Sequence, residues 1–434
     1  MNSRFEDILR EIFKSCLDTC FPHVQPFSPA EAPLLLCGVC AWWRTIALTT
    51  PELWARLSVS IGREGSDKAQ QPSQQLIKTW IARSGARPLT LVLKDLGLRS
   101  DMAEDVLQIL LPHIHRWQSI TFLLPNYPFP SALMDVERLF GGASQLQIAN
   151  LEFGDDPAFQ AADTPQVAGL ARLLSASSQL HTLYYRNDLC TLRFLDISWA
   201  HLTVIDLVPM WSPMSQIIEI MQKAPKLRSL SVFIEDACKV VRPLLLPDLV
   251  ILWIGSKVEI GPLFKQLTLP ALSNINVFCG NLVPPVPQTD VVDCVARSGC
   301  SLRIAIFKSL GISKADLITF LRLSPTLLLF EVSNDGAATI TDDIVGLLTA
   351  GNTSCLCPHL RIIRFLESSV SSADGLLADM VASRRTKGSP ASLSRLVVDF
   401  SDADLPRHAA DIRRLRGLEE APSFRVWINQ PETE

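Results

Sequence analysis

Hydrophobic residues near the start of the chain follow a helical pattern. They recur at intervals of three and four residues, at Phe5, Ile8, Leu9, Ile12 and Phe13. This spacing places the side chains on one face of a helix. After the segment FPHVQPFSP, a second helical pattern contains Leu35, Val39, Trp42 or Trp43, and Ile46, and the Thr-Thr-Pro run at 49–51 ends it. Residues 1 to about 58 are therefore predicted to form short helices.

Further along, a cassette of the form L-x-x-L-x-V recurs many times. One anchor residue is followed by two alternating apolar residues, as in a strand with one buried face. A period in the range of roughly 20–50 residues indicates a repeat array, in which only stacked neighbours close the core. The clear copies begin at Leu180, Leu202, Leu227, Leu249, Leu272, Leu327, Leu360 and Leu393, and related copies begin at Trp117, Ile148 and Leu302.

The segments between the copies favour helices where they are long. Helical patterns are present in PQVAGLARLLSASS, MSQIIEIMQKAP, KADLITFLRLSP and DDIVGLLTAG. Where the copies lie close together, between Leu202 and Leu227 or between Leu249 and Leu272, we expect a tighter return path. Strands that alternate with such connections predict an α/β repeat fold.

The N-terminal pattern also resembles a known family. The stretches EDILREIFKSCL and SPAEAPLLLCGVCAWWRTIALTTPELWARLSVS resemble the F-box-like segment of fungal F-box proteins, and the cassettes resemble the degenerate leucine-rich repeats that commonly follow an F-box. The resemblance implies docking onto a Skp-type adaptor of a cullin ubiquitin ligase. The residues that match its docking positions are Ile8, Leu9, Ile12 and Phe13 in the first helix and Leu35, Val39, Cys40 and Trp43 in the third.

These patterns together predict a two-part protein that combines α+β and α/β repeat character. A short all-α F-box-like module would occupy residues 1–60 and a polar linker residues 61–75. An α/β leucine-rich-repeat solenoid, or horseshoe, would follow at residues 76–434, with Leu53 and Trp54 joining the module to the first repeat. Such a chain would be a substrate-recognition adaptor without its own catalytic centre, and the captured substrate would be a protein.

One row of strand residues is predicted to face away from the solenoid core. The residue between the last two apolar positions of each cassette lies on this row, because side chains alternate along a strand. Trp253 is either part of a protein-binding face or covered by a neighbouring loop or the C-terminal tail. The expected substrate-binding residues are Tyr184, Asp206, Trp253, Asn276, Glu331 and Arg364, with Ser231 and Val397 on the same row.

Composition and charge narrow the class of partner. Hydrophobic residues make up 48% of the chain and charged residues 19%, which predicts a folded protein. The net charge of -4 provides no basic footprint for nucleic acid or an anionic membrane, so proteins are the expected partners. The 11 cysteines lie mostly in apolar surroundings, which favours a reducing compartment, cytoplasmic or nuclear.

The candidate chemistry of the sequence has simpler interpretations. Cys16, Cys20, Cys37 and Cys40 form two pairs that could hold zinc, but both pairs lie on helical patterns, so we expect packing residues and no metal or cofactor. The basic residues of 407–416 are expected on a solvated last helix. Two alternatives remain open. The first is an interaction scaffold with a decayed F-box cap, supported by Phe5-Glu6-Asp7 where the family usually has Leu-Pro. The second is a hydrolase whose triad forms only in space.

Overall fold

The computed structural model divides the chain into two compact units, residues 1–210 and 211–434. This boundary lies inside a strand, whereas the predicted linker at 61–75 falls within the first unit; most of that linker, residues 62–72, lies outside the described residues. The structure describes residues 3–18, 27, 29–61, 73–95, 102–125, 145–154, 173–186, 197–239, 242–280, 289–333, 339–351, 355–367, 370–385, 392–402, 404–418 and 424–429.

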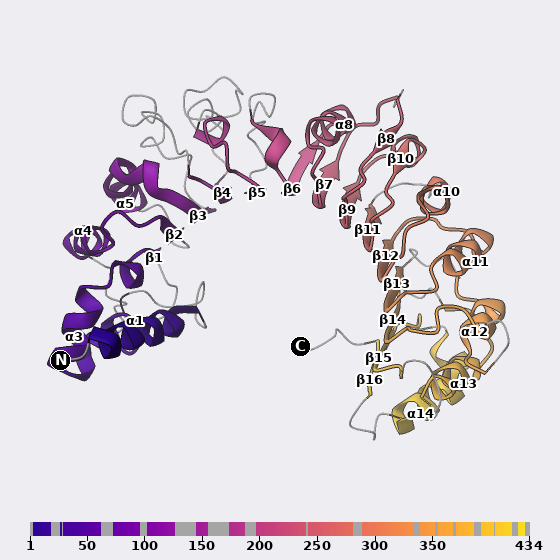
Figure 1. Ribbon diagram of the computed structural model, residues 1–434. Coiled ribbons are helices and arrows are strands. Elements are labelled where there is room, and N and C mark those ends of the chain that lie inside the picture. Colours follow the sequence, from indigo (N-terminus) through magenta and orange to yellow (C-terminus); the bar gives the residue numbers. More distant parts are fainter. Residues whose placement is uncertain are drawn as a thin grey trace. The chain divides into compact units, whose positions relative to one another are not determined.

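The first unit begins with helices and continues with parallel strands (Figure 1). All described pairings between its neighbouring strands are parallel, and they join the six strands in chain order. Its elements are α1 (Ser3–Asp18), α2 (Leu34–Val39), α3 (Ala41–Leu48), η1 (Pro51–Trp54), β1 (Arg56–Ile61), α4 (Gln74–Arg83), β2 (Leu89–Asp95), α5 (Met102–Leu110), η2 (Leu111–Arg116), β3 (Trp117–Leu124), β4 (Ile148–Phe153), β5 (Thr182–Arg186), η6 (Trp199–His201) and β6 (Val204–Ser212).

The second helical pattern of the sequence is interrupted in the structure. A single helical spacing was expected from Leu35 to Ile46, but Cys40 is extended, with φ -159° and ψ 168°, and separates α2 from α3. Its Sγ accepts a hydrogen bond from the backbone N–H of Trp43 at 3.4 Å. The Arg44 side chain donates from Nε to the carbonyl of Cys37 at 2.8 Å, which ties the two helices together. The thiol thus caps a new helix, which the apolar periodicity does not reveal.

Residues at the end of the predicted helical module form a strand instead. The prediction of helices up to residue 58 is wrong for β1, whose Leu57, Val59 and Ile61 alternate and are buried. The strand pairs in parallel with β2, and that pairing buries its apolar face. The expected join between the module and the repeats is present: Trp54 packs edge-on against Trp80 of α4, with ring centroids 4.8 Å apart.

The second unit alternates strands with helices. Its eight main strands pair only in parallel, in chain order, and β8 pairs with β10 in a small separate sheet. Figure 1 shows α10 to α14 along one side of these strands. The elements are α8 (Met214–Lys223), β7 (Ser229–Ile234), β8 (Leu244–Leu245), β9 (Ile251–Ser256), α9 (Gly261–Phe264), β10 (Leu267–Thr268), β11 (Asn274–Cys279), α10 (Thr289–Ser298), β12 (Ile304–Lys308), α11 (Lys314–Leu323), β13 (Leu329–Ser333), α12 (Asp342–Leu348), β14 (Ile362–Leu366), α13 (Leu376–Ser383), β15 (Arg395–Val398), η7 (Leu405–His408), α14 (Ala409–Leu418) and β16 (Arg425–Ile428).

The apolar positions of the cassettes form the core of both units. In each of the eight clear cassettes from Leu180 to Val398, all three apolar residues are buried, with no more than 2% of their surface exposed. The blurred copy at Leu302 also forms a strand, β12, and its Ala305 is fully buried. The prediction of a mixed α/β fold with parallel strands is therefore confirmed, and the finer assignment to leucine-rich repeats stays a prediction.

The connections between strands agree with the sequence patterns in part. Helices α8, α11 and α12 lie in the predicted segments, and the short α9 gives the tight return expected between Leu249 and Leu272. Between Leu202 and Leu227 two expectations conflict, and the structure decides for the helical pattern of MSQIIEIMQKAP: the ten-residue α8 forms there, so the return path is not the tighter one expected from the short spacing. The segment PQVAGLARLLSASS lies largely outside the described residues. None of the described helices is long and apolar enough to cross a membrane.

Candidate functional site

The N-terminal helices expose several large apolar side chains. Ile8 is 56% exposed and Ile12 50% exposed on α1, and on α2 Leu35 and Val39 are 46% and 54% exposed. Helices packed only within a domain usually bury such residues, whereas exposed clusters of them mark interaction sites. We refer to these four exposed residues as the apolar docking face, after the docking role that the sequence predicts for them.

The other predicted docking residues have different environments. Leu9 and Phe13 of α1 are buried, and the Phe13 ring lies against that of Trp43 with centroids 4.9 Å apart. These residues hold the helices together beneath the docking face. Cys40 is exposed and caps α3. The structure therefore divides the predicted set into exposed positions and buried or half-buried positions, and the sequence spacing alone does not separate them.

A shallow hollow lies beside the docking face, between α1 and η1. Its volume is about 710 Å³, and its lining includes Ile8 and Ile12. On its far wall the Glu52 carboxylate forms an ion pair with Arg87 at 2.6 Å and lies 4.0 Å from the Lys14 ammonium. The hollow therefore combines apolar lining residues with a charged rim. Protein-protein interfaces usually have the same arrangement, an apolar centre surrounded by polar residues.

The predicted outward row is aligned in the second unit. Ser231, Trp253 and Asn276 are direct partners in neighbouring strands, and Glu331, Arg364 and Val397 are aligned in the same way further along. In β7 and β11 the outward residues are half-buried and alternate with buried ones. The sequence thus predicted the alignment of this row correctly. Val397 is buried, with 4% of its surface exposed, which contradicts its predicted place on an open face. The role of the row in binding stays a prediction.

Trp253 belongs to an aromatic cluster on this row. Its ring meets Phe233 edge-on at 4.9 Å, and Phe233 stacks on Trp211 at 4.4 Å. The Lys257 ammonium lies 3.8 Å from the centroid of the Trp211 ring. Gly255 is required here, because a Cβ atom at this position would come within 2.0 Å of the Phe233 ring. Among the described residues, Trp253 therefore packs against a strand neighbour and keeps part of its ring exposed.

Glu331 and Arg364 are bound to each other. The Glu331 carboxylate forms ion pairs with Arg364 Nη1 and with Lys308 Nζ, both at 3.0 Å, and only 2% of the residue is exposed. We had expected Glu331 to be a surface contact. The two cations instead cover its carboxylate, which compensates the cost of burying the charge. Lys308 and Arg364 remain the accessible parts of this triad.

The first unit contributes Tyr184 and Asp206, which are paired across β5 and β6. Both are half-buried. Burial raises the pKa of Asp206. Two weaker effects lower that pKa: the Asp206 carboxylate accepts a hydrogen bond from the N–H of Val208 at 3.1 Å, and the positive charge of Arg186 lies nearby. The hydrogen bond to Val208 fixes this carboxylate against its own strand, so Asp206 is also a structural residue.

The described cysteines differ in exposure: Cys16 and Cys40 are exposed, which contradicts the packing role predicted for them, whereas Cys279, Cys294, Cys300 and Cys357 are buried. The Cys16 thiol donates to the carbonyl of Ile12 at 3.3 Å, and burial raises the pKa of Cys37. Cys20 lies outside the described residues. Burial raises the pKa of Cys279 and Cys357 to about 12. Thiols with such values stay protonated at neutral pH, which disfavours a nucleophilic role for them.

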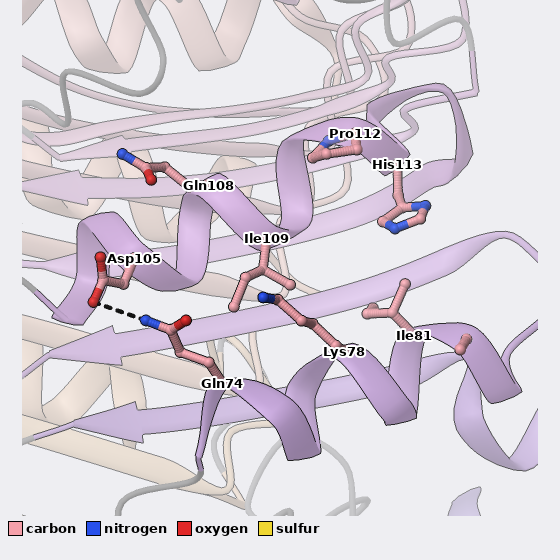
Figure 2. A pocket seen from close by; sticks show the side chains of 9 residues that line it. Gln74, Lys78, Ile81, Asp105, Gln108, Ile109, Pro112 and His113 are labelled. Atoms are coloured by element: carbon pink, nitrogen blue, oxygen red, sulfur yellow. Dashed lines mark hydrogen bonds between the residues drawn. The ribbon is translucent and has the colours of Figure 1, made fainter.

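A groove of about 470 Å³ lies between α4 and the α5–η2 segment (Figure 2). Across it, Gln74 Nε2 donates to the Asp105 carboxylate at 3.0 Å, and Lys78 and His113 line the walls. Burial lowers the pKa of His113, and the nearby Arg116 lowers it further. The groove separates two helices that cover neighbouring strands, and its hydrogen bond joins them.

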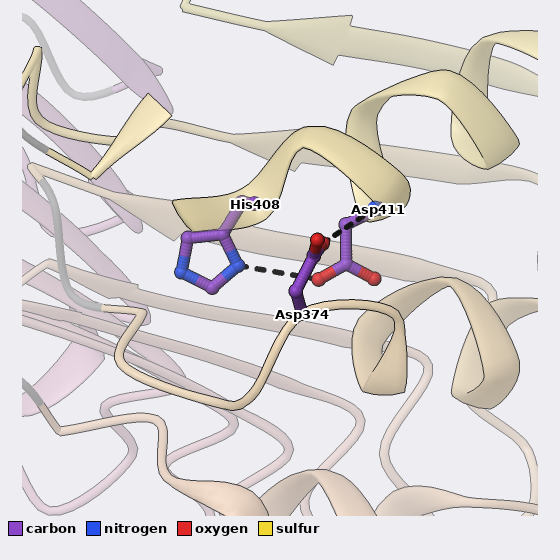
Figure 3. Close-up of side chains that lie close together, drawn as sticks. All are labelled: Asp374, His408 and Asp411. Atoms are coloured by element: carbon purple, nitrogen blue, oxygen red, sulfur yellow. Dashed lines mark hydrogen bonds and ion pairs between the residues drawn. The ribbon is translucent and has the colours of Figure 1, made fainter. Parts of the chain in front are cut away.

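Asp374, His408 and Asp411 bring three potential metal ligands within 4.8 Å of one another (Figure 3). Their atoms already have partners. Asp374 accepts from the backbone N–H of Ala410 and of Asp411, and Asp411 accepts from the N–H of Ala378 at 2.8 Å. His408 Nδ1 lies 3.2 Å from the other Asp411 oxygen. The arrangement is a helix cap for α14 that links it to α13.

Replacing Asp374 by Ala should lower the free energy of unfolding by about 1 kcal/mol near pH 7, the scale of a lost helix cap. The N–H of Asp411 holds the pKa of Asp374 below its ordinary value, so the ionised carboxylate stabilises the folded chain. That contribution is fully present above the unfolded pKa of about 3.9 and is lost as the pH falls through the lower folded value. Thermal melting of both proteins from about pH 7 to about pH 3 measures the effect.

The variant Asp374→Asn is the matched control for this measurement. It keeps one acceptor oxygen at the cap and removes the charge, so its stability near pH 7 should lie between those of the wild type and the Ala variant. A difference between wild type and Asp374→Ala that increases below about pH 4 would contradict the assignment.

No protein-family model matches the chain, and no curated protein sequence matches it either.

Proposed function

We propose that the chain is the substrate-recognition adaptor subunit of a Skp/cullin/F-box ubiquitin ligase. The observation that carries the proposal is the apolar docking face, which the helical module presents while Leu9 and Phe13 hold the module together from below. The four exposed residues coincide with positions that the resemblance to fungal F-box-like segments assigns to adaptor contact. A partner that covers them would remove a large apolar surface from water.

In this proposal the chain itself carries out no chemistry. The helical module binds the Skp-type adaptor, and the cullin complex supplies ubiquitin transfer. The outward row of the repeats, including Trp253, captures a protein substrate, because half-buried aromatic and Arg residues commonly dominate such contacts. The compartment would be the cytoplasm or the nucleus.

The double variant Ile8→Asp, Ile12→Asp should abolish adaptor binding. Both side chains are exposed, so the substitutions leave the helix core intact, but they would bury two unpaired charges in the interface. We expect a loss of affinity of roughly a hundredfold or more, since two contact positions are affected at once. Co-purification of the full chain with a Skp-type adaptor, followed by calorimetric titration, measures it.

A matched control replaces two exposed leucines of the second unit, Leu245→Asp and Leu323→Asp. These are 64% and 37% exposed and should leave adaptor affinity unchanged. If the folded wild-type chain does not bind the adaptor at micromolar concentrations, or if both double variants lose binding equally, the proposal fails.

A second candidate is a protein-interaction scaffold whose N-terminal segment is a decayed F-box cap. It is favoured by Phe5, which stands near the expected Leu-Pro start and stacks on Trp42 with centroids 5.6 Å apart and planes 9° apart. Because of this stacking, the start of α1 packs against α3 of the same module and does not project toward a partner. The same titration separates the two candidates, because a scaffold would bind no adaptor.

A further inference from the structure

The amino-terminal edge of the last strands carries a row of arginines. Arg303 and Arg361 immediately precede β12 and β14, and Arg395 and Arg425 are the first residues of β15 and β16. Figure 1 shows these strands side by side in the second unit. We refer to these four residues as the arginine row.

Backbone hydrogen bonds fix two adjacent register positions along this edge: Arg303 and Arg361 lie in the first, and Arg395 and Arg425 lie one residue further along, in the second. The N–H of Leu328 donates to the carbonyl of Arg303 at 2.8 Å, and the N–H of Arg361 donates to the carbonyl of Leu328 at 2.9 Å. Arg395 is the direct strand partner of Arg425. Parallel strands lie about 4.8 Å apart, so the backbone of the row extends over roughly 19 Å from β12 to β16.

Three of the four charges of the row are exposed, whereas Arg395 is half-buried and lies over Trp427. Arg303, Arg361 and Arg425 are exposed, and within the described part of the chain none of these three forms an ion pair with a carboxylate. The segments that lead into the strands contain no Asp or Glu among their described residues, which are 299–303, 324–328, 355–361, 392–394 and 424. Four cations thus lie together on a chain whose net charge is -4.

The charges of this sheet differ between its two edges. At the carboxyl ends of the strands, Glu367 follows β14 and Asp399 follows β15. The Glu367 carboxylate accepts from Ser333 Oγ at 2.7 Å, and the Asp399 carboxylate accepts from the N–H of Glu367 at 3.4 Å. The carboxyl edge thus carries acidic residues together with Lys308 at the end of β12, whereas the described residues of the amino-terminal edge carry arginines without acidic neighbours, so an anionic ligand would be attracted more strongly to the amino-terminal edge.

Apolar side chains lie between the arginines. Ile304, Leu329 and Ile362 are half-buried partners in neighbouring strands, next to Arg395 in the same register. The Arg395 guanidinium lies over the ring of Trp427, 5.4 Å from its centroid. An edge that combines cations with neighbouring aliphatic residues fits a polypeptide with both acidic and apolar side chains better than a nucleic-acid backbone, which offers mainly phosphate charge at such an edge.

We propose that the arginine row binds an acidic segment of a partner protein, in which Asp or Glu alternates with apolar residues. The inference rests on the proposed function in one respect: the acidic segment is taken to belong to the protein substrate that the chain captures. An extended segment advances about 3.3 Å per residue, so about six residues span the row. Its carboxylates pair with the arginines, and its apolar residues contact the aliphatic side chains between them.

The test uses the full chain without adaptor and a fluorescent acidic peptide of about twelve residues, roughly twice the span of the row. The peptide contains glutamates interspersed with leucines, and a second peptide has glutamine in place of every glutamate. Fluorescence anisotropy measures binding to the wild type and to the triple variant Arg303→Glu, Arg361→Glu, Arg425→Glu. We expect the triple variant to bind at least roughly tenfold more weakly, and higher salt to weaken wild-type binding.

The control variant is Arg322→Glu, Arg413→Glu, Arg416→Glu, which changes the net charge by the same amount at exposed helical positions of the same unit. It should change the affinity less than about twofold. Melting curves of both variants show that they fold, and an Arg-to-Gln triple variant at the row should give an intermediate loss.

Several outcomes would overturn the inference. These are absence of saturable binding of the acidic peptide, equal binding of the glutamine peptide, and equal weakening by the control variant. Tighter binding of a single-stranded RNA oligonucleotide that depends on the same arginines would assign the row to nucleic acid instead. Peptide binding by a chain that fails to bind a Skp-type adaptor would preserve the arginine row and refute only the ligase role.

Discussion

Replacing Arg384 by Met should lower the free energy of unfolding by about 3–5 kcal/mol. This arginine is 1% exposed, and burial lowers its pKa. Its guanidinium donates to the carbonyls of Leu348, Leu356 and Cys357, two of them at 2.8 and 3.0 Å. Without it, two buried carbonyls and the half-buried carbonyl of Leu356 lose their donor, and α12 loses a cation at its C-terminus.

Chemical denaturation followed by circular dichroism measures this loss, and hydrogen exchange in α12 locates it. Arg384→Lys should recover only part of the stability, since one ammonium does not reproduce the fork of a guanidinium. Arg322→Met, at an exposed position of α11, is the control and should change the stability by less than about 0.5 kcal/mol. A loss below about 1 kcal/mol for Arg384→Met would mean that the carbonyls find other donors.

Trp54→Ala should destabilise the first unit by about 3–5 kcal/mol, the usual cost of deleting a buried aromatic side chain. The Trp54 ring is fully buried, donates from Nε1 to the carbonyl of Ala47 at 2.9 Å and packs against Trp80. Arg83 lies over the same ring at 4.5 Å. The loss would open the contact between the helical module and α4, which limited proteolysis and denaturation curves of the full chain would detect.

Trp42→Ala is the matched control in the same module. Trp42 is half-buried and stacks only with Phe5 among the described aromatic residues, so its removal should cost less than half as much. Trp54→Phe should retain most of the packing and lose the hydrogen bond to Ala47. Equal effects of Trp54→Ala and Trp42→Ala would show that Trp54 does not join the two parts.

The sequence was a reliable guide to the repeat core because its signal is local. An anchor Leu and two alternating apolar residues specify a buried strand face, and α8, α11 and α12 follow from helical spacing. The break at Cys40 was missed, because a thiol acceptor capping a helix leaves no mark on the apolar pattern. The strand β1 was missed because Leu57, Val59 and Ile61 follow directly on a helical run.

Features that depend on contacts between distant repeats could not be predicted. Glu331 and Arg364 are 33 residues apart, and nothing in either strand indicates that they pair. The arginine row likewise combines residues from four repeats, each an ordinary surface residue by itself. The division of the predicted docking residues of α1 into exposed Ile8 and Ile12 and buried Leu9 and Phe13 depends on how the helices pack, since all four share the same periodic pattern.

Strict nearest-neighbour pairing of the strands has an evolutionary consequence. Among the described residues, the eight main strands of the second unit pair only with their neighbours in the array, and the offset between aligned residues varies from 22 to 33. The connections can therefore lengthen or shorten, and whole repeats can be duplicated or deleted, while the rest of the core keeps its contacts. Selection can thus change the length and chemistry of the exposed edge one repeat at a time.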